Sequence, residues 1–78
     1  MSNVTIYTTS SCSWCHRAMD FFNANKVKFT EVNVQEQPDK AQEMIEKSGQ
    51  MGVPVIDVDG QIIVGFNEPA IRKALKLK

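Results

Sequence analysis

Two cysteines separated by two residues are the part of this sequence best suited to chemistry. Cys12 and Cys15 are the only cysteines among the 78 residues. The β-branched and aromatic run at residues 4–8, just before them, is typical of a strand. After them, apolar residues recur at the spacing of one helix face: Cys15, Ala18, Met19 and Phe22. We therefore expect Cys12 where a strand ends and a helix begins.

The start of a helix favours a negative charge, because its first N–H groups are unpaired and the helix dipole is positive there. A cysteine thiolate is such a charge, and the thiolate is the nucleophilic form of the residue. Cys12 is therefore predicted to attack a disulfide, and Cys15, one helical turn further on, to resolve the mixed disulfide. Thr9, Ser10 and Ser11 offer hydroxyl groups that are expected to cap the helix.

Three other interpretations of the cysteine pair compete with a redox dithiol. A structural disulfide would close a very short loop and gain little stability in the chain-entropy model. A zinc site needs four ligands, and because His16 is the only histidine we predict no metal site within one chain. Residues 12–16 also match the C-x-x-C-H pattern of haem attachment, but that interpretation favours an exported, mostly helical chain.

The composition predicts an ordinary soluble globular protein, with residues 1–78 forming a single, monomeric domain. Nine basic and nine acidic residues give zero net charge, which favours neither nucleic-acid binding nor a basic membrane surface. No apolar run reaches membrane-spanning length, and no signal peptide is predicted. Two cysteines without an export signal indicate the cytoplasm, where disulfides are usually transient and catalytic.

Hydrophobic spacing and turn residues predict seven elements in the order β-α-β-α-β-β-α. Strands are expected at about residues 4–8, 27–34, 55–58 and 61–64, and helices at about residues 13–25 and 38–48 and after Asn67. Gly49 is expected to end the second helix, and Asp59-Gly60 to form a hairpin turn. The crossover makes the first two strands parallel, and the hairpin is antiparallel, so a small mixed sheet with helices on its faces follows.

Short segments spread over nearly the whole chain carry a family resemblance. They are Ile6-Tyr7-Thr8, Cys15-His16-Arg17-Ala18, Glu43-Met44-Ile45, Lys47-Ser48-Gly49, Val53-Pro54 and Gly65. Together with the C-x-x-C pair they resemble the glutaredoxins. The resemblance implies the thioredoxin fold, an α/β architecture with a four-stranded mixed sheet flanked by three helices. It also implies a thiol–disulfide oxidoreductase that reduces protein or glutathione mixed disulfides, in electron transport and cell redox homeostasis, with no bound cofactor.

The same resemblance implies roles for individual residues. Cys12 would be the exposed nucleophile and Cys15 the shielded resolving thiol. Pro54 would be cis and face the cysteines, and the backbone of Val53 would pair with a bound substrate. The residues implied to contact the substrate or glutathione are Trp14, Val53, Pro54, Gly65, Phe66 and Asn67. Trp14 has the alternative of a partly buried packing residue.

The sequence also departs from the usual glutaredoxin pattern. Ser13-Trp14 replaces Pro-Tyr between the cysteines, Thr9 stands where a lysine often meets a glutathione carboxylate, and Asn67 stands where an acid meets the glutathione ammonium. Gly65-Phe66 resembles the small redoxins that serve ribonucleotide reductase and are reduced by thioredoxin reductase with NADPH. Glutathione and thioredoxin reductase thus both stay open as electron sources. A further alternative is an iron–sulfur cluster shared between two subunits with glutathione.

Overall fold

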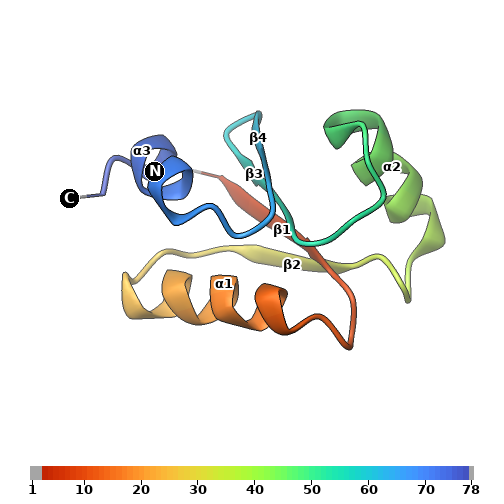
Figure 1. The fold of residues 1–78 in the computed structure, drawn as a ribbon, viewed down its shortest axis with the longest axis horizontal. Helices are drawn as coiled ribbons and strands as arrows, with labels where there is room; N and C mark the ends of the chain where they lie inside the picture. The colour runs from red at the N-terminus through yellow and green to blue at the C-terminus, as the bar shows by residue number, and fades with distance from the viewer. Residues whose placement is uncertain (1–2, 78) are drawn as a thin grey trace.

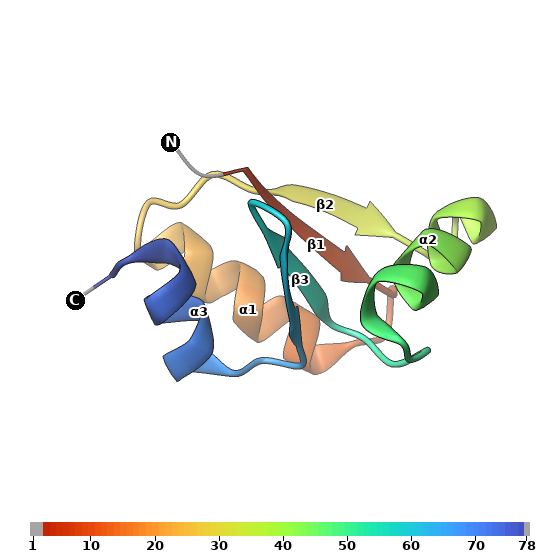
Figure 2. The same cartoon turned by 90° about the horizontal axis from the view of Figure 1, so that it is seen from above.

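Two helices cover one face of a four-stranded sheet, and a third helix lies against the other face (Figures 1 and 2). The computed structural model describes residues 3–77. The strands are β1 (Val4–Thr8), β2 (Thr30–Asn33), β3 (Val55–Val58) and β4 (Gln61–Val64). The helices are α1 (Ser13–Ala24), α2 (Pro38–Ser48) and α3 (Glu68–Leu75). The predicted order of elements and the thioredoxin-like fold are confirmed.

The sheet is mixed, with the strand order β2-β1-β3-β4. β1 is parallel to β2, and Tyr7 lies opposite Val32. β1 is antiparallel to β3, where Tyr7 lies opposite Val55, and β3 is antiparallel to β4. β1 is therefore a central strand, and the cysteine pair follows directly from its carboxyl end. Within residues 3–77, no helix is long and apolar enough to span a membrane.

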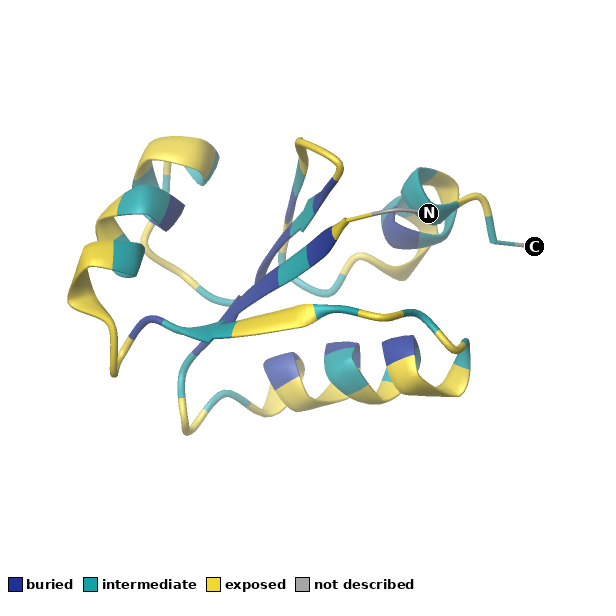
Figure 3. Ribbon diagram, turned by 180° about the vertical axis from the view of Figure 1, so that it is seen from behind, coloured by how far each residue is buried: buried dark blue, intermediate teal, exposed yellow. Residues whose placement is uncertain are grey.

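Alternation along the strands divides the core into two clusters, one on each face of the sheet. Ile6 belongs to the cluster that contains Phe22 of α1 and Ile71 of α3. The next residue, Tyr7, belongs to the cluster that contains Met44 of α2. Successive strand side chains point to opposite faces, which explains why neighbours in sequence serve different clusters. In Figure 3 the buried positions of α1 lie on its side towards the sheet.

The second strand is shorter than predicted, because the chain turns before it pairs. The sequence predicts a strand over about residues 27–34, whereas β2 spans Thr30–Asn33. Lys26 has a positive φ of 58°, and the Val27 N–H donates to the Phe22 carbonyl at 2.8 Å, so this stretch closes the end of α1. Val27 and Phe29 do not extend the strand; they pack against the core cluster that contains Phe22 of α1.

The predicted helix end and hairpin turn are both present. Gly49 has a left-handed φ of 74°, and its N–H donates to the Ile45 carbonyl at 2.7 Å. This is the usual way in which glycine ends a helix. Asp59 and Gly60 have φ values of 52° and 93°, the positive pair that a tight hairpin turn between β3 and β4 requires.

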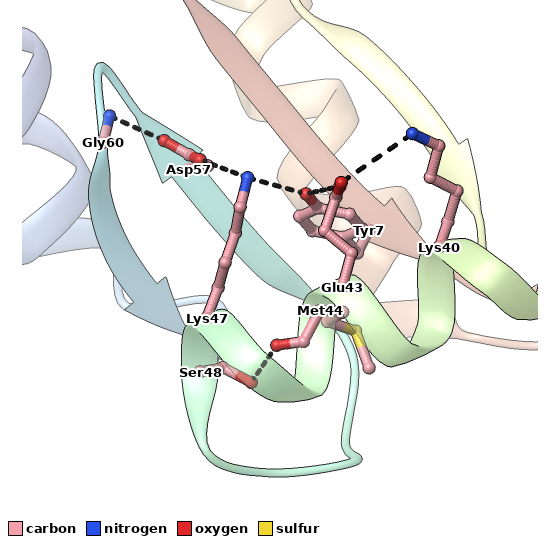
Figure 4. Close-up of polar contacts among 8 residues, drawn as sticks. All are labelled: Tyr7, Lys40, Glu43, Met44, Lys47, Ser48, Asp57 and Gly60. Carbon is pink, nitrogen blue, oxygen red and sulfur yellow. Dashed lines mark hydrogen bonds and ion pairs between the residues drawn. The ribbon is translucent and has the colours of Figure 1, made fainter.

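A polar network fastens α2 to the sheet on the face opposite α1 (Figure 4). The buried Tyr7 hydroxyl donates to Glu43 Oε2 at 2.8 Å, and Lys47 Nζ donates to that hydroxyl at 3.2 Å. Lys47 Nζ also lies 3.1 Å from Asp57 Oδ2 on β3. Burial raises the pKa of Tyr7. The hydrogen bond from the Tyr7 hydroxyl lowers the pKa of Glu43, and the hydrogen bond to the same hydroxyl raises the pKa of Lys47. At neutral pH these shifts favour a protonated Tyr7, an ionised Glu43 and a charged Lys47, which are the states that these hydrogen bonds need.

We expect Tyr7→Phe to lower the free energy of unfolding by about 1 kcal/mol at pH 7, because it removes hydrogen bonds to two charged groups that water can still solvate. The Glu43 contribution is present above its ordinary pKa of 4.5 and lost as the pH falls through its lowered value. The Lys47 contribution is present below its ordinary pKa of 10.5 and lost as the pH rises through its raised value. Urea unfolding of the wild-type protein and Tyr7→Phe at pH 3 and pH 7 checks this. If Tyr7→Phe lowered the free energy of unfolding equally at both pH values, the expectation would be contradicted.

Candidate active site

The two cysteines form a disulfide at the start of α1. Cys12 lies immediately before the helix and is partly exposed, whereas Cys15 is 0% exposed in the first turn. Their Cα atoms are 5.3 Å apart. Cys12 is thus the more exposed cysteine of the pair, and Cys15 lies in the protein interior.

Cys12 itself caps the helix, in place of the hydroxyl groups that the sequence indicates. Its Sγ accepts a hydrogen bond from the Cys15 N–H at 3.1 Å. The expectation of a serine or threonine cap is wrong because Cys12, in extended conformation, is the residue directly before the first helical position. When the disulfide is reduced, this N–H and the helix dipole favour a thiolate at the Cys12 sulfur.

Polar residues at the end of β2 and just after it hold the loop in front of Cys12. Asn33 Nδ2 donates to Ser10 Oγ at 3.1 Å, and the Ser10 N–H donates to Gln35 Oε1 at 3.3 Å. Asn33 Oδ1 in turn accepts from the Gln35 N–H at 2.9 Å. Sequence reasoning missed Asn33 and Gln35, although an asparagine at a strand end before a polar connection is a signal for such a turn.

A pocket of about 260 Å³ is lined in part by Trp14, the residue between the two cysteines. Its walls come from three segments of the chain: Trp14, Val53 with Pro54, and Gly65 with Phe66. The Val53–Pro54 peptide bond is cis, as the resemblance implies. The Gly65 N–H donates to the Pro54 carbonyl at 2.8 Å, and Gly65 has a φ of 77°, which glycine adopts without strain. None of the lining residues carries a charge.

The structure gathers the residues that the resemblance implies for substrate binding, apart from Asn67. Asn67 is the N-cap of α3, and its Oδ1 accepts a hydrogen bond from the Ala70 N–H at 3.2 Å. Trp14 is 55% exposed, so a substrate-contacting role and a role as a partly buried packing residue both stay open. Its ring meets the Phe66 ring at 6.4 Å between centroids, and this contact makes one side of the pocket.

Residues 4–63 match the sequence profile of the glutaredoxin family. The chain belongs to that family. This glutaredoxin is 40% identical over 73 residues to a glutaredoxin-like 8.6 kDa protein of the rubredoxin operon of Clostridium pasteurianum, covering 94% of the chain and 97% of that protein. It is also 40% identical over 68 residues to glutaredoxin 3 of Escherichia coli, covering 87% of the chain and 82% of that protein. The glutaredoxin-like protein NrdH of Lactococcus lactis is 30% identical over 70 residues, with 90% and 96% covered.

Solved structures agree with this assignment. The NrdH-redoxin of Escherichia coli superposes with a TM-score of 0.82 at 25% identity, covering 91% of this glutaredoxin and 92% of that chain. The glutaredoxin of Archaeoglobus fulgidus shares the fold with a TM-score of 0.87 at 23% identity, covering 97% and 88%. Family membership and the C-x-x-C pair make the protein a dithiol–disulfide oxidoreductase.

Proposed function

We propose that Cys12 is the attacking thiol and Cys15 the resolving thiol in the reduction of protein disulfides. The Cys12 thiolate attacks one sulfur of the substrate disulfide, forms a mixed disulfide and releases the other substrate sulfur as a thiolate that takes up a proton. The Cys15 sulfur, after losing its proton, then attacks the Cys12 sulfur and releases the second substrate thiol. Two electrons pass to the substrate, and the Cys12–Cys15 disulfide remains. The capped, partly exposed Cys12 and the buried Cys15 support these roles.

We propose that Val53, the residue before the cis-proline, binds an extended segment of the substrate. Among residues 3–77, the main-chain N–H and C=O groups of Val53 have no hydrogen-bond partner. An extended peptide can pair with such groups as an added strand. The apolar walls at Trp14 and Phe66 would receive a side chain next to the disulfide of the substrate.

We also propose that the protein acts in the cytoplasm and takes part in redox homeostasis there. The cytoplasm is reducing, and disulfides in that compartment are usually transient and catalytic.

We further propose that thioredoxin reductase with NADPH, and not glutathione, is the main electron source. The uncharged pocket is the observation that carries this proposal. Glutathione has two carboxylates and an ammonium, and Thr9 and Asn67 stand where many glutaredoxins offer a lysine and an acid. The Escherichia coli relative described as having a thioredoxin-like activity profile supports the same choice. On this proposal the substrates include ribonucleotide reductase, which the small redoxins serve.

We expect thioredoxin reductase with NADPH to reduce the Cys12–Cys15 disulfide about tenfold faster than millimolar glutathione, because two missing charged hydrogen bonds weaken glutathione binding. Each reductant is supplied alone to the oxidised protein, and the rate is read from Trp14, the only tryptophan. An oxidised protein without added reductant serves as the control. Turnover with glutathione and glutathione reductase, with no response to thioredoxin reductase, would refute the proposed donor.

A further inference from the structure

A positive charge is stacked on the exposed tryptophan of the redox site. The Arg17 guanidinium carbon lies 5.0 Å from the centroid of the Trp14 ring. Both residues are exposed, and Trp14 lies between the two cysteines. Stacking on an aromatic face holds a planar guanidinium in place at little cost, because the ring attracts the cation and its N–H groups remain free along the edge. Arg17 is therefore a pre-oriented cation on the residue that lies between the two cysteines.

No carboxylate of residues 3–77 neutralises this cation. The ion pairs in that part of the chain join Lys40 to Glu43, Lys47 to Asp57 and Arg72 to Glu68. Asp20, one turn further along α1, is exposed and makes no ion pair with Arg17. The donors of Arg17 are thus available to an acidic group from outside.

Arg17 lies outside the pocket, although it touches one of its walls. The pocket is lined by Trp14 together with residues of the cis-proline loop and the Gly65-Phe66 segment, and Arg17 is absent from that lining. A group that meets Arg17 therefore belongs to a neighbouring part of the substrate and not to the residue seated in the pocket. An extended protein segment has such neighbouring side chains.

We infer that Arg17 determines specificity by favouring protein disulfides that are flanked by an acidic side chain. This inference rests on the proposed function, in which protein disulfides are the substrates. Arginine binds a carboxylate with paired hydrogen bonds, and a complementary charge beside the site raises the rate of productive encounter. Arg17 takes no part in the bond changes: the electrons and protons move between the four sulfur atoms as described above. Its effect is on which substrate is bound.

Three disulfide-bridged peptides that differ in one residue test the inference. The residue next to one cysteine is Asp, Asn or Lys, and the rate constant of each peptide with pre-reduced protein is measured at low salt. We expect the wild-type protein to favour the Asp peptide over the Lys peptide about fivefold, the size expected of one exposed charge pair. The readout is the ratio of the two rate constants. A variant that is less active towards all peptides therefore keeps the same ratio.

Variants of Arg17 are expected to change the ratio in order of charge. Arg17→Ala should bring the ratio to about one, Arg17→Glu should reverse it, and Arg17→Lys should leave it in between, because it keeps the charge but loses the planar stacking. Lys28→Ala is the matched control: it removes one exposed charge in the segment between α1 and β2, and the ratio should stay at the wild-type value. About 1 M salt should lower the wild-type ratio towards one, since it screens exposed charges.

The outcomes separate this inference from the function on which it rests. If the wild-type protein reduces all three peptides at equal rates, or if Arg17→Ala and Lys28→Ala change the ratio equally, the role of Arg17 is refuted and the proposed function stands. If no peptide is reduced, the Asn peptide included, the proposed function itself fails. A preference for Asp that is lost only in Arg17→Ala and reversed in Arg17→Glu is the result that the inference requires.

Discussion

Replacing Cys12 with serine is expected to lower the rate of disulfide reduction by on the order of a thousandfold or more, because a hydroxyl is a far weaker nucleophile than a thiolate. Cys15 cannot take over the attack, since its side chain is 0% exposed. The measurement is the single-turnover reduction of a disulfide peptide by pre-reduced protein. Residual activity above a few per cent in Cys12→Ser would show that the roles of the two cysteines are assigned wrongly.

The companion change, Cys15→Ser, is expected to stop the reaction one step later. Cys12 still attacks, but no internal thiol resolves the mixed disulfide, so a covalent complex with the peptide accumulates. Mass spectrometry under non-reducing conditions detects this complex. Serine is nearly isosteric with cysteine, which makes Cys12→Ser the matched control: no complex should form. A complex in Cys12→Ser but not in Cys15→Ser would reverse the proposed order of the steps.

The second large effect concerns glutathione. The double change Thr9→Lys with Asn67→Asp is expected to raise the rate of reduction by glutathione about tenfold, because it supplies a cation and an acid where glutaredoxins often have them. Both positions tolerate the change. Thr9 uses its main-chain carbonyl, not its side chain, to accept the Cys12 N–H. Aspartate caps a helix as well as asparagine does, so the hydrogen bond from the Ala70 N–H is kept.

Thr9→Met with Asn67→Asp is the matched control for that experiment. It places a side chain of similar length at position 9 without the positive charge. We expect the control to gain little, and salt to diminish the gain of the double variant. If the double variant and its control both react with glutathione at the wild-type rate, the missing charges at these positions do not limit the rate of reduction by glutathione.

The sequence predicts the helices and three strands well, because their apolar spacing matches the period of each element. β2 shows the limit of this signal. Val27 and Phe29 are apolar and β-prone, yet they lie before the strand and pack against the core cluster that contains Phe22. The pairing of β1 with β2 starts only where Thr5 lies opposite Thr30. Apolar character alone does not reveal whether a residue pairs in a sheet or packs at the end of a helix.

The candidate site is predicted in part. The position of Cys12 at the start of a helix follows from the strand and helix patterns on either side, and the pocket residues follow from the family resemblance. The contacts of Asn33 and Gln35 with Ser10 join residues 23 and 25 positions apart, and local patterns carry no information at that range. The stacking of Arg17 on Trp14 depends on side-chain directions along α1, which spacing permits but does not require.

Alkylation of the reduced protein tests most directly whether Cys12 is the activated thiol. Reduced wild-type protein is treated briefly with iodoacetamide at pH 6, quenched, and each cysteine is assayed by peptide mass spectrometry. At this pH a free cysteine, with a pKa of about 8.5, is almost entirely protonated and reacts slowly. We expect Cys12 to be labelled rapidly and Cys15 to remain unmodified. Labelling of Cys15 ahead of Cys12, or labelling of Cys12 no faster than a free cysteine, would contradict it.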